Sequence, residues 1–97
     1  MDYFIEQTEI FEQWLESMRD IRAKAAIVRR ISRVRSGHFG DYKSIGNGVS
    51  EMRIDIGQGY RVYFTIRERT VVFLLNGGDK SGQQSDIKRA FELAREV

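Results

Sequence analysis

Three basic residues, Arg53, Arg61 and Lys80, are the side chains of this chain that could act together on an anion. Two of them lie in the stretch 48–64, GVSEMRIDIGQGYRVYF, where apolar and polar residues alternate on both sides of the loop 57–59. The alternation predicts two β-strands, because successive side chains of a strand point to opposite faces of a sheet. One face would enter the core, and the other, which carries both arginines and a phenol, would stay free. Guanidinium groups on a free face suit a phosphate-bearing partner.

Antiparallel pairing of these two strands would place Asp55 opposite Arg61 and Arg53 opposite Tyr63. The two arginines would then be diagonal neighbours, about 7–8 Å apart at the backbone. The last strand is expected to run antiparallel to the Arg61 strand, so that its exit at Lys80 returns beside Arg61. We therefore expect the three cations to meet at one end of the sheet.

Carboxylates on neighbouring strands allow a second interpretation. The same pairing logic across the preceding glycine-rich loop places Asp41 opposite Arg53 and Lys43 opposite Glu51. These carboxylates could hold the cations in ordinary cross-strand ion pairs, which are common on open sheet faces. A ligand site is favoured instead by the glycine pair at 77–78, which permits close backbone approach, and by the helix N-terminus that follows it. Both interpretations remain open.

The remaining pattern predicts an α+β fold with the element order β-α-α-β-β-β-β-α. Thr8 and Asp20 are typical N-cap residues, and would begin two helices that pair as a hairpin, the second ending near Gly37. Apolar stripes at helical spacing are Phe11, Trp14, Leu15 and Met18, then Ile21, Ala25, Val28, Ile31 and Val34, and, in a last helix over 84–97, Ile87, Ala90, Phe91, Ala94 and Val97. The expected strands are 2–7, 41–45, 49–56, 60–66 and 71–76. Together they predict a twisted, mostly antiparallel sheet with an N-terminal helix hairpin and a C-terminal helix packed on it.

Composition limits the class of protein. The 97 residues suffice for one domain, 1–97, and the 41% hydrophobic content is that of a folded chain. The chain has no cysteine, which excludes disulfides and thiolate metal sites, and its single histidine, His38, cannot form a metal site alone. No apolar run is long enough to span a membrane, and the acidic start does not resemble a signal peptide. We expect a soluble, cytoplasmic protein without a metal or cofactor.

Positive charge is concentrated in residues 19–43, although the net charge of the chain is only +2. This distribution favours an anionic partner, but the bases of the second helix also fit a solvated helix face, and both interpretations remain open. These bases are Arg22, Lys24, Arg29, Arg30 and Arg33. The chain contains no GxSxG elbow, P-loop or GxGxxG motif, so classical hydrolases and nucleotide enzymes are poor candidates.

Three blocks of sequence resemble the RelE/ParE toxin superfamily, and most closely its phage-derived, HigB-like (Gp49-like) addiction-module killer proteins. They are the stretch 48–64, the segment NGGDKSGQQSDI at 76–87, and the arrangement WLxxMRD…GxFGDYK that begins at Trp14. The resemblance covers almost the whole chain. It implies the toxin of a type II toxin–antitoxin pair. In this superfamily the RelE and HigB branches cleave messenger RNA, usually on the ribosome, whereas the ParE branch poisons DNA gyrase.

The resemblance also implies roles for individual residues. Arg61 corresponds to the arginine that contacts the scissile phosphate, and Arg53 and Lys80 match further basic positions of the site. The other residues expected to contact RNA are Lys43, Tyr63, Ser81, Gln83 and His38. RelE carries a tyrosine in its C-terminal helix that stacks on the substrate base, whereas this chain has Ser85, Asp86 and Ile87 in the corresponding region.

The function expected from the resemblance is a metal-independent, ribosome-dependent mRNA endoribonuclease that inhibits translation. Because RNA supplies its own nucleophile, the 2′-hydroxyl, the protein need not provide a serine or cysteine. The expected partners are mRNA, the ribosome and a cognate antitoxin, a helix-turn-helix protein. Two alternatives remain: a non-catalytic inhibitor of gyrase in the manner of ParE, and an RNA-binding module without catalysis.

Overall fold

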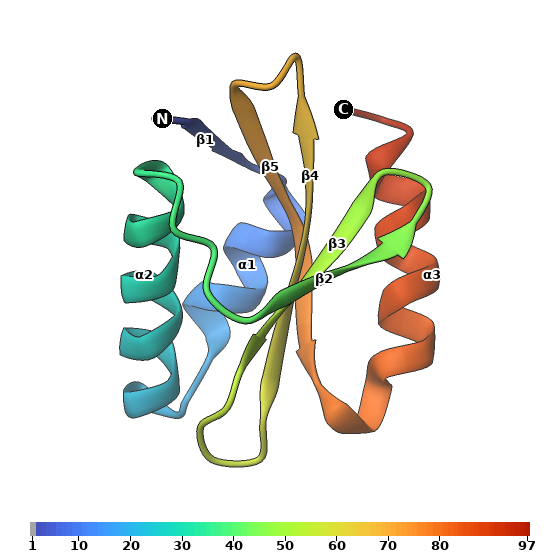
Figure 1. Cartoon of the computed structure of the whole chain (residues 1–97). Coiled ribbons are helices and arrows are strands. Elements are labelled where there is room, and N and C mark those ends of the chain that lie inside the picture. Colours follow the sequence, from blue (N-terminus) through green and yellow to red (C-terminus); the bar gives the residue numbers. More distant parts are fainter. Residues whose placement is uncertain (1) are drawn as a thin grey trace.

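The computed structural model describes residues 2–97. These residues form nine elements, and Figure 1 shows their arrangement. They are β1 (Phe4–Gln7), α1 (Glu9–Ser17), α2 (Ile21–Arg35), β2 (Tyr42–Gly46), β3 (Val49–Ile54), β4 (Tyr60–Arg67), β5 (Val71–Asp79), the 3-10 helix η1 (Lys80–Gly82) and α3 (Gln83–Ala94). The predicted element order is confirmed, with η1 added between the last strand and α3.

The five strands form one sheet in the order β1-β5-β4-β3-β2, in which only β1 and β5 pair in parallel. Helices α1 and α2 cover one face of the sheet, and α3 covers the other (Figure 1). Thr8 and Asp20 cap α1 and α2 as predicted, because their side chains accept hydrogen bonds from Phe11 N and Ala23 N. Among residues 2–97 none of the helices combines the length and the apolar character that a bilayer crossing requires.

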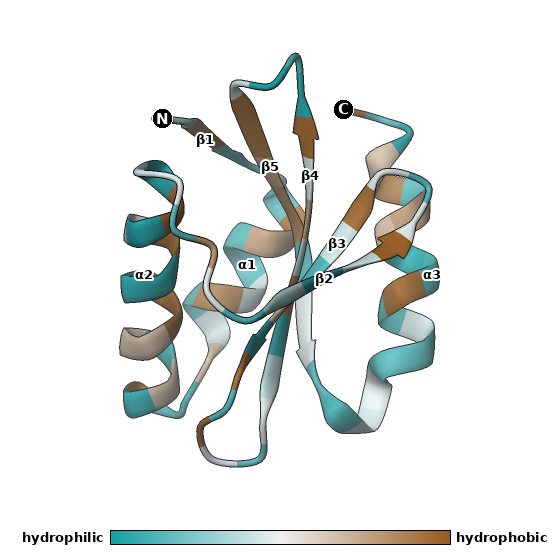
Figure 2. Cartoon of the chain, viewed as in Figure 1, coloured by the Kyte–Doolittle hydropathy of each residue, from teal (hydrophilic) through white to brown (hydrophobic). Residues whose placement is uncertain are grey.

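The strands contribute side chains to two cores, one on each face. Met52, Val62 and Phe64 pack with α1 and α2, whereas Val49 and Tyr63 pack with α3. Figure 2 shows apolar residues on strands and on the inner sides of helices. The expectation that the second face stays free is therefore wrong over much of its length. α3 lies on it, because Ala90, Leu93 and Ala94 need an apolar surface to cover them.

The inward face of α2 differs from the predicted stripe. Ala23, Ile27 and Val34 are fully buried, whereas Ile21 is 80% exposed and Val28 is 49% exposed. Arg30 contributes to this rotation of the helix, because its guanidinium donates to the backbone oxygens of Phe39, Asp41 and Arg53. It is thus part of the fold and not of a solvated basic surface. Partial burial lowers the pKa of Arg30.

The glycine pair on β5 makes room for side chains of the protein itself. A β carbon on Gly77 would overlap the indole of Trp14, and one on Gly78 would overlap the carboxylate of Asp86. The sequence predicts that this pair admits a ligand, but Trp14 and Asp86 occupy the space at the two glycines, from opposite faces of the sheet. We expect Gly78→Ala to lower the free energy of unfolding by about 1–3 kcal/mol through overpacking. Urea denaturation measures this, with Gly82→Ala as the milder control, since its β carbon would meet Asp86 at 3.3 Å.

Candidate active site

The hairpin between β3 and β4 brings the two arginines closer than predicted. Arg53 pairs directly with Arg61, and Glu51 with Tyr63, so the predicted register is wrong by two residues. The strand β3 ends at Ile54, because Ile56 N donates to Ile54 O and Gly59 N donates to Ile56 O, which folds 55–59 into the connecting loop. Directly opposite like charges destabilise a sheet unless other groups stabilise them.

A pocket of about 330 Å³ opens beside this pair. Arg53, Arg61 and Lys80 all line it, together with Asp41, Ile54, Asp55, Gly59 and Tyr60. Lys80 reaches the pocket from the end of β5, where Arg61 pairs with Gly78 and Tyr60 with Asp79. The three cations therefore meet at one end of the sheet, as the strand directions predict, and the two carboxylates leave the lining with a net charge of +1.

Arg61 is fixed by a buried carboxylate. Its Nε lies 3.5 Å from Oε1 of Glu51, and the two side chains are 13% and 1% exposed, respectively. The other oxygen of Glu51 accepts a hydrogen bond of 3.0 Å from Nε2 of Gln83 on α3. Neither Nε of Arg61 nor Oε1 of Glu51 has a hydrogen-bond partner within residues 2–97, so this contact is an ion pair without a hydrogen bond. The hydrogen bonds of these residues do not engage the terminal nitrogens of Arg61 either. Glu51 thus lies beside Nε of Arg61, and the two terminal nitrogens of the guanidinium remain available to the pocket.

Arg53 is held on the opposite side by surface groups. Its Nη2 lies 3.1 Å from Oδ1 of Asp41, and both side chains are substantially exposed. Its backbone N donates to Asp41 O, so Asp41 lies opposite Arg53 as predicted. Arg30 binds the backbone oxygens of both residues and fixes the loop that carries Asp41. This exposed ion pair contributes little to stability and can exchange for another anion.

Lys80 differs from the two arginines in having no anionic partner within residues 2–97. Its side chain passes over Gly59, where a β carbon would meet Cε of Lys80 at 2.7 Å. Gly59 also has a φ of +84°, a conformation that L side chains rarely adopt. Gly59 therefore allows the tight turn of the loop, and its lack of a β carbon leaves space for the Lys80 side chain to enter the pocket.

The five other residues expected to contact RNA do not line this pocket. Lys43 is exposed and pairs with Glu51 in the predicted register, and His38 is exposed in the loop after α2. Gln83 binds Glu51. Ser81 donates from both N and Oγ to Asp79, which lowers the pKa of that carboxyl.

Tyr63 is fully buried under α3, so its predicted exposure is wrong. Its hydroxyl has no hydrogen-bond partner within residues 2–97. Burial, reinforced by the charges of Glu51 and Asp86, raises the pKa of the phenol well above its usual value. The pKa of Asp86 is also raised, by burial and then by Asp79.

We expect Tyr63→Phe to raise the free energy of unfolding by about 1 kcal/mol at neutral pH, because the buried hydroxyl makes no bond. The wild-type protein should also lose stability as the pH rises above about 10, since the unfolded phenol then releases its proton while the folded one keeps it. Denaturation at pH 7 and pH 10.5 checks both. A less stable Tyr63→Phe protein would contradict this account.

The sequence pattern does not predict that Glu51 is buried and pairs with Arg61 in this site. An alternating strand pattern assigns Glu51 to a polar face, but cannot tell a solvated carboxylate from one buried beneath a helix. The only available signal was its place two residues before Arg53 on the face shared with Arg61. Within residues 2–97 no three histidine, aspartate or glutamate side chains come together as a metal site would require.

Comparison with known proteins gives both a family and a fold. Residues 13–96 match the family described as "Phage derived protein Gp49-like (DUF891)". An uncharacterized protein of Haemophilus influenzae is 50% identical over 93 residues, which are 96% of this chain and 94% of the relative.

Two solved structures are similar in fold. One is a mutant of the Escherichia coli toxin RelE in the free state, with a TM-score of 0.71 and 19% identity over 92% of this chain and 98% of RelE. The other is the toxin–antitoxin complex RelBE2 of Mycobacterium tuberculosis, with a TM-score of 0.65 and 20% identity over 82% of this chain and 100% of the matched chain. At these identities the likeness establishes the fold, and it agrees with the predicted RelE-like architecture.

Proposed function

Because this chain belongs to the phage-derived Gp49-like family and has the fold of RelE, we propose that it is the toxin of a toxin–antitoxin pair and cleaves messenger RNA. The observation that carries the proposal is the meeting of Arg53, Arg61 and Lys80 in one pocket. Asp41 and Glu51 pair with the two opposed arginines, but the lining of the pocket keeps a net positive charge, which supports an anion as its ligand.

The anion is the phosphodiester that is cut. The 2′-hydroxyl of the RNA attacks the phosphorus in line, the bond to the 5′-oxygen breaks, and a 2′,3′-cyclic phosphate forms. Negative charge builds on the non-bridging oxygens, where fixed cationic donors stabilise it most. The Nε of Arg61 lies against Glu51 in an ion pair, which leaves the terminal nitrogens for this purpose, and Arg53 faces Arg61 across the strand pair.

The reaction also moves two protons. One leaves the 2′-hydroxyl, and Asp55 is the carboxylate of the pocket without an ion-pair partner within residues 2–97, so it is the proton acceptor. The other reaches the departing 5′-oxygen, and Lys80, a cation of the pocket that forms no ion pair within residues 2–97, donates it. General acid–base catalysis of this kind contributes roughly 10²–10⁴-fold. On the ribosome, further rate enhancement comes from the fixed orientation of the mRNA.

An antitoxin completes the system. Similar folds are known in complex with antitoxins, as in RelBE2. The pocket with a net positive lining is the surface that an acidic segment of such a partner would neutralise.

Controlled expression in a bacterial host tests the proposal. We expect growth arrest with fragmented mRNA, and rescue by a small helix-turn-helix protein encoded next to the toxin. Sequencing of RNA ends and a reporter of DNA damage are read in the same cells. Arrest with intact mRNA and a DNA-damage response would instead favour gyrase as the target.

A further inference from the structure

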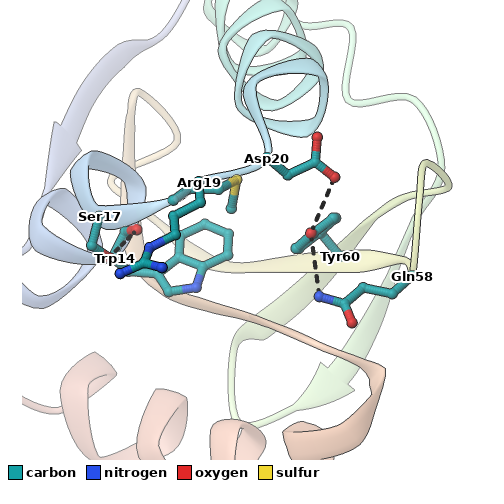
Figure 3. A pocket seen from close by; sticks show the side chains of 7 residues that line it. Trp14, Ser17, Arg19, Asp20, Gln58 and Tyr60 are labelled. Atoms are coloured by element: carbon teal, nitrogen blue, oxygen red, sulfur yellow. Dashed lines mark hydrogen bonds between the residues drawn. The ribbon is translucent and has the colours of Figure 1, made fainter.

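A second pocket, of about 460 Å³, lies next to the cationic one and shares Tyr60 with it. It is formed between the α1–α2 connection and the β3–β4 loop. Figure 3 shows Trp14, Ser17 and Arg19 on one side, and Tyr60 with Gln58 on the other. The volume is in the range of small-molecule sites.

Arg53 and Arg61 project from the face of the sheet that α3 covers, whereas Trp14 lies on the face of α1 and α2, and Tyr60 at the β3–β4 hairpin lines both pockets. An RNA strand with one phosphate among the three cations reaches the second pocket by passing around the end of this hairpin.

Trp14 provides a rigid aromatic surface in this pocket. The six-membered ring of its indole lies over Gly77, where a β carbon would overlap it, and its ring centroid is 5.7 Å from that of Phe11. These contacts fix the orientation of the indole, while the side chain remains partly exposed and lines the pocket. An immobile aromatic ring beside a phosphate site is suited to stacking on a base, because it loses no further side-chain freedom on binding.

The opposite wall offers polar groups. The hydroxyl of Tyr60 donates to Oδ2 of Asp20 at 3.5 Å and accepts from Nε2 of Gln58 at 3.3 Å. Oδ1 of Asp20 caps α2 through Ala23 N, so its carboxylate serves the fold. No hydrogen bond within residues 2–97 uses the amide oxygen of Gln58 or the guanidinium of Arg19. These groups match the polar edge of a base.

We propose that this pocket binds one base of the RNA, from a nucleotide on one side of the scissile phosphate, with the base stacked against Trp14. The inference rests on the proposed function and adds to it a site that selects for a base. It also assigns base stacking to α1, in a chain whose C-terminal helix has Ser85, Asp86 and Ile87 where RelE carries a stacking tyrosine.

Trp14 is the only tryptophan of the chain, so all tryptophan emission comes from this one side chain of the pocket. The probes are a short single-stranded RNA with 2′-O-methyl groups, which cannot be cleaved, and the same oligonucleotide with abasic positions. We expect the intact probe to quench the emission of Trp14. We also expect it to bind about 10-fold more tightly than the abasic probe in calorimetric titration, which serves equally for variants without tryptophan. The abasic probe, which keeps the phosphates, should bind with little quenching.

Variants separate this inference from the proposed function. Gln58→Ala, which changes an exposed side chain, and Trp14→Phe should each reduce the preference for the intact probe. Phe4→Ala is the control, because it removes an aromatic ring that is 73% exposed and lies elsewhere, and it should leave the preference unchanged. Arg61→Lys should weaken both probes by the same factor. Equal affinity for both probes without quenching would overturn the base site while leaving the phosphate site intact. Failure of both probes to bind would overturn both proposals. Quenching by an antitoxin peptide but not by RNA would show that the pocket instead binds the partner.

Discussion

Arg61→Lys should reduce mRNA cleavage on programmed ribosomes by about 10²-fold or more and abolish growth arrest, while the protein stays folded. Lysine keeps a positive charge beside the buried Glu51, but it lacks the fork of donors that arginine directs at a phosphate. Cleavage is measured by primer extension on a defined mRNA, and folding by circular dichroism and thermal melting.

Arg61→Ala is a poorer test when made alone. It would leave the carboxylate of Glu51, 1% exposed, without its cation, and removal of one partner of a buried pair costs about 3–5 kcal/mol. The double variant Arg61→Ala with Glu51→Gln removes both charges and should regain most of that stability without regaining cleavage. Restored cleavage in the double variant, or full activity of Arg61→Lys, would refute the phosphate-binding role of Arg61.

Glu51→Ala should produce the largest loss of stability of the substitutions at the site, about 3–5 kcal/mol. It leaves the guanidinium of Arg61, 13% exposed, facing Arg53 without a counter-charge, and removes the acceptor of the Gln83 amide. For a chain of this size the melting temperature should fall by roughly 12 °C or more. Thermal melting monitored by circular dichroism measures the effect.

Asp41→Ala is the matched control, because it removes the other ion pair with an arginine of the site. That pair is exposed, with side-chain exposures of 42% and 58%, and its loss should cost less than about 1 kcal/mol. If Glu51→Ala and Asp41→Ala were equally mild, Glu51 would not be the group that positions Arg61.

The sequence predicts which strand residues share a face better than it predicts their register. The real hairpin is shifted by two residues, and a shift of two preserves the faces on which side chains lie, whereas a shift of one would have reversed them. For that reason Arg53 and Arg61 were correctly placed on one face. The direction of β5 brought Lys80 to the same end of the sheet, and this too follows from strand order alone.

The sequence pattern does not predict which helix covers each face of the sheet. The polar residues Glu51 and Thr65 are almost fully buried, because α3 covers the face that alternation marks as polar. The predicted stripe of α2 differs from the buried one because apolar residues occur on more than one side of this helix. The hydrogen bonds from Arg30 to three backbone oxygens contribute to deciding which side faces the sheet. The helical spacing of Trp14 with Phe11, Leu15 and Met18 predicts that its indole packs inward. The indole does pack on β5 but also lines a pocket, which the spacing cannot reveal.

The most direct test of the central claim, that this pocket cuts RNA with the 2′-hydroxyl as nucleophile, is the chemical nature of the new RNA ends. Purified protein is incubated with ribosomes and a defined mRNA, and the fragments are treated with a kinase or a phosphatase before sequencing. The account predicts 2′,3′-cyclic phosphates on upstream fragments and 5′-hydroxyls on downstream fragments, with none when the scissile nucleotide carries a 2′-deoxy sugar. Fragments with 5′-phosphates, or cleavage that persists at the 2′-deoxy position, would contradict it.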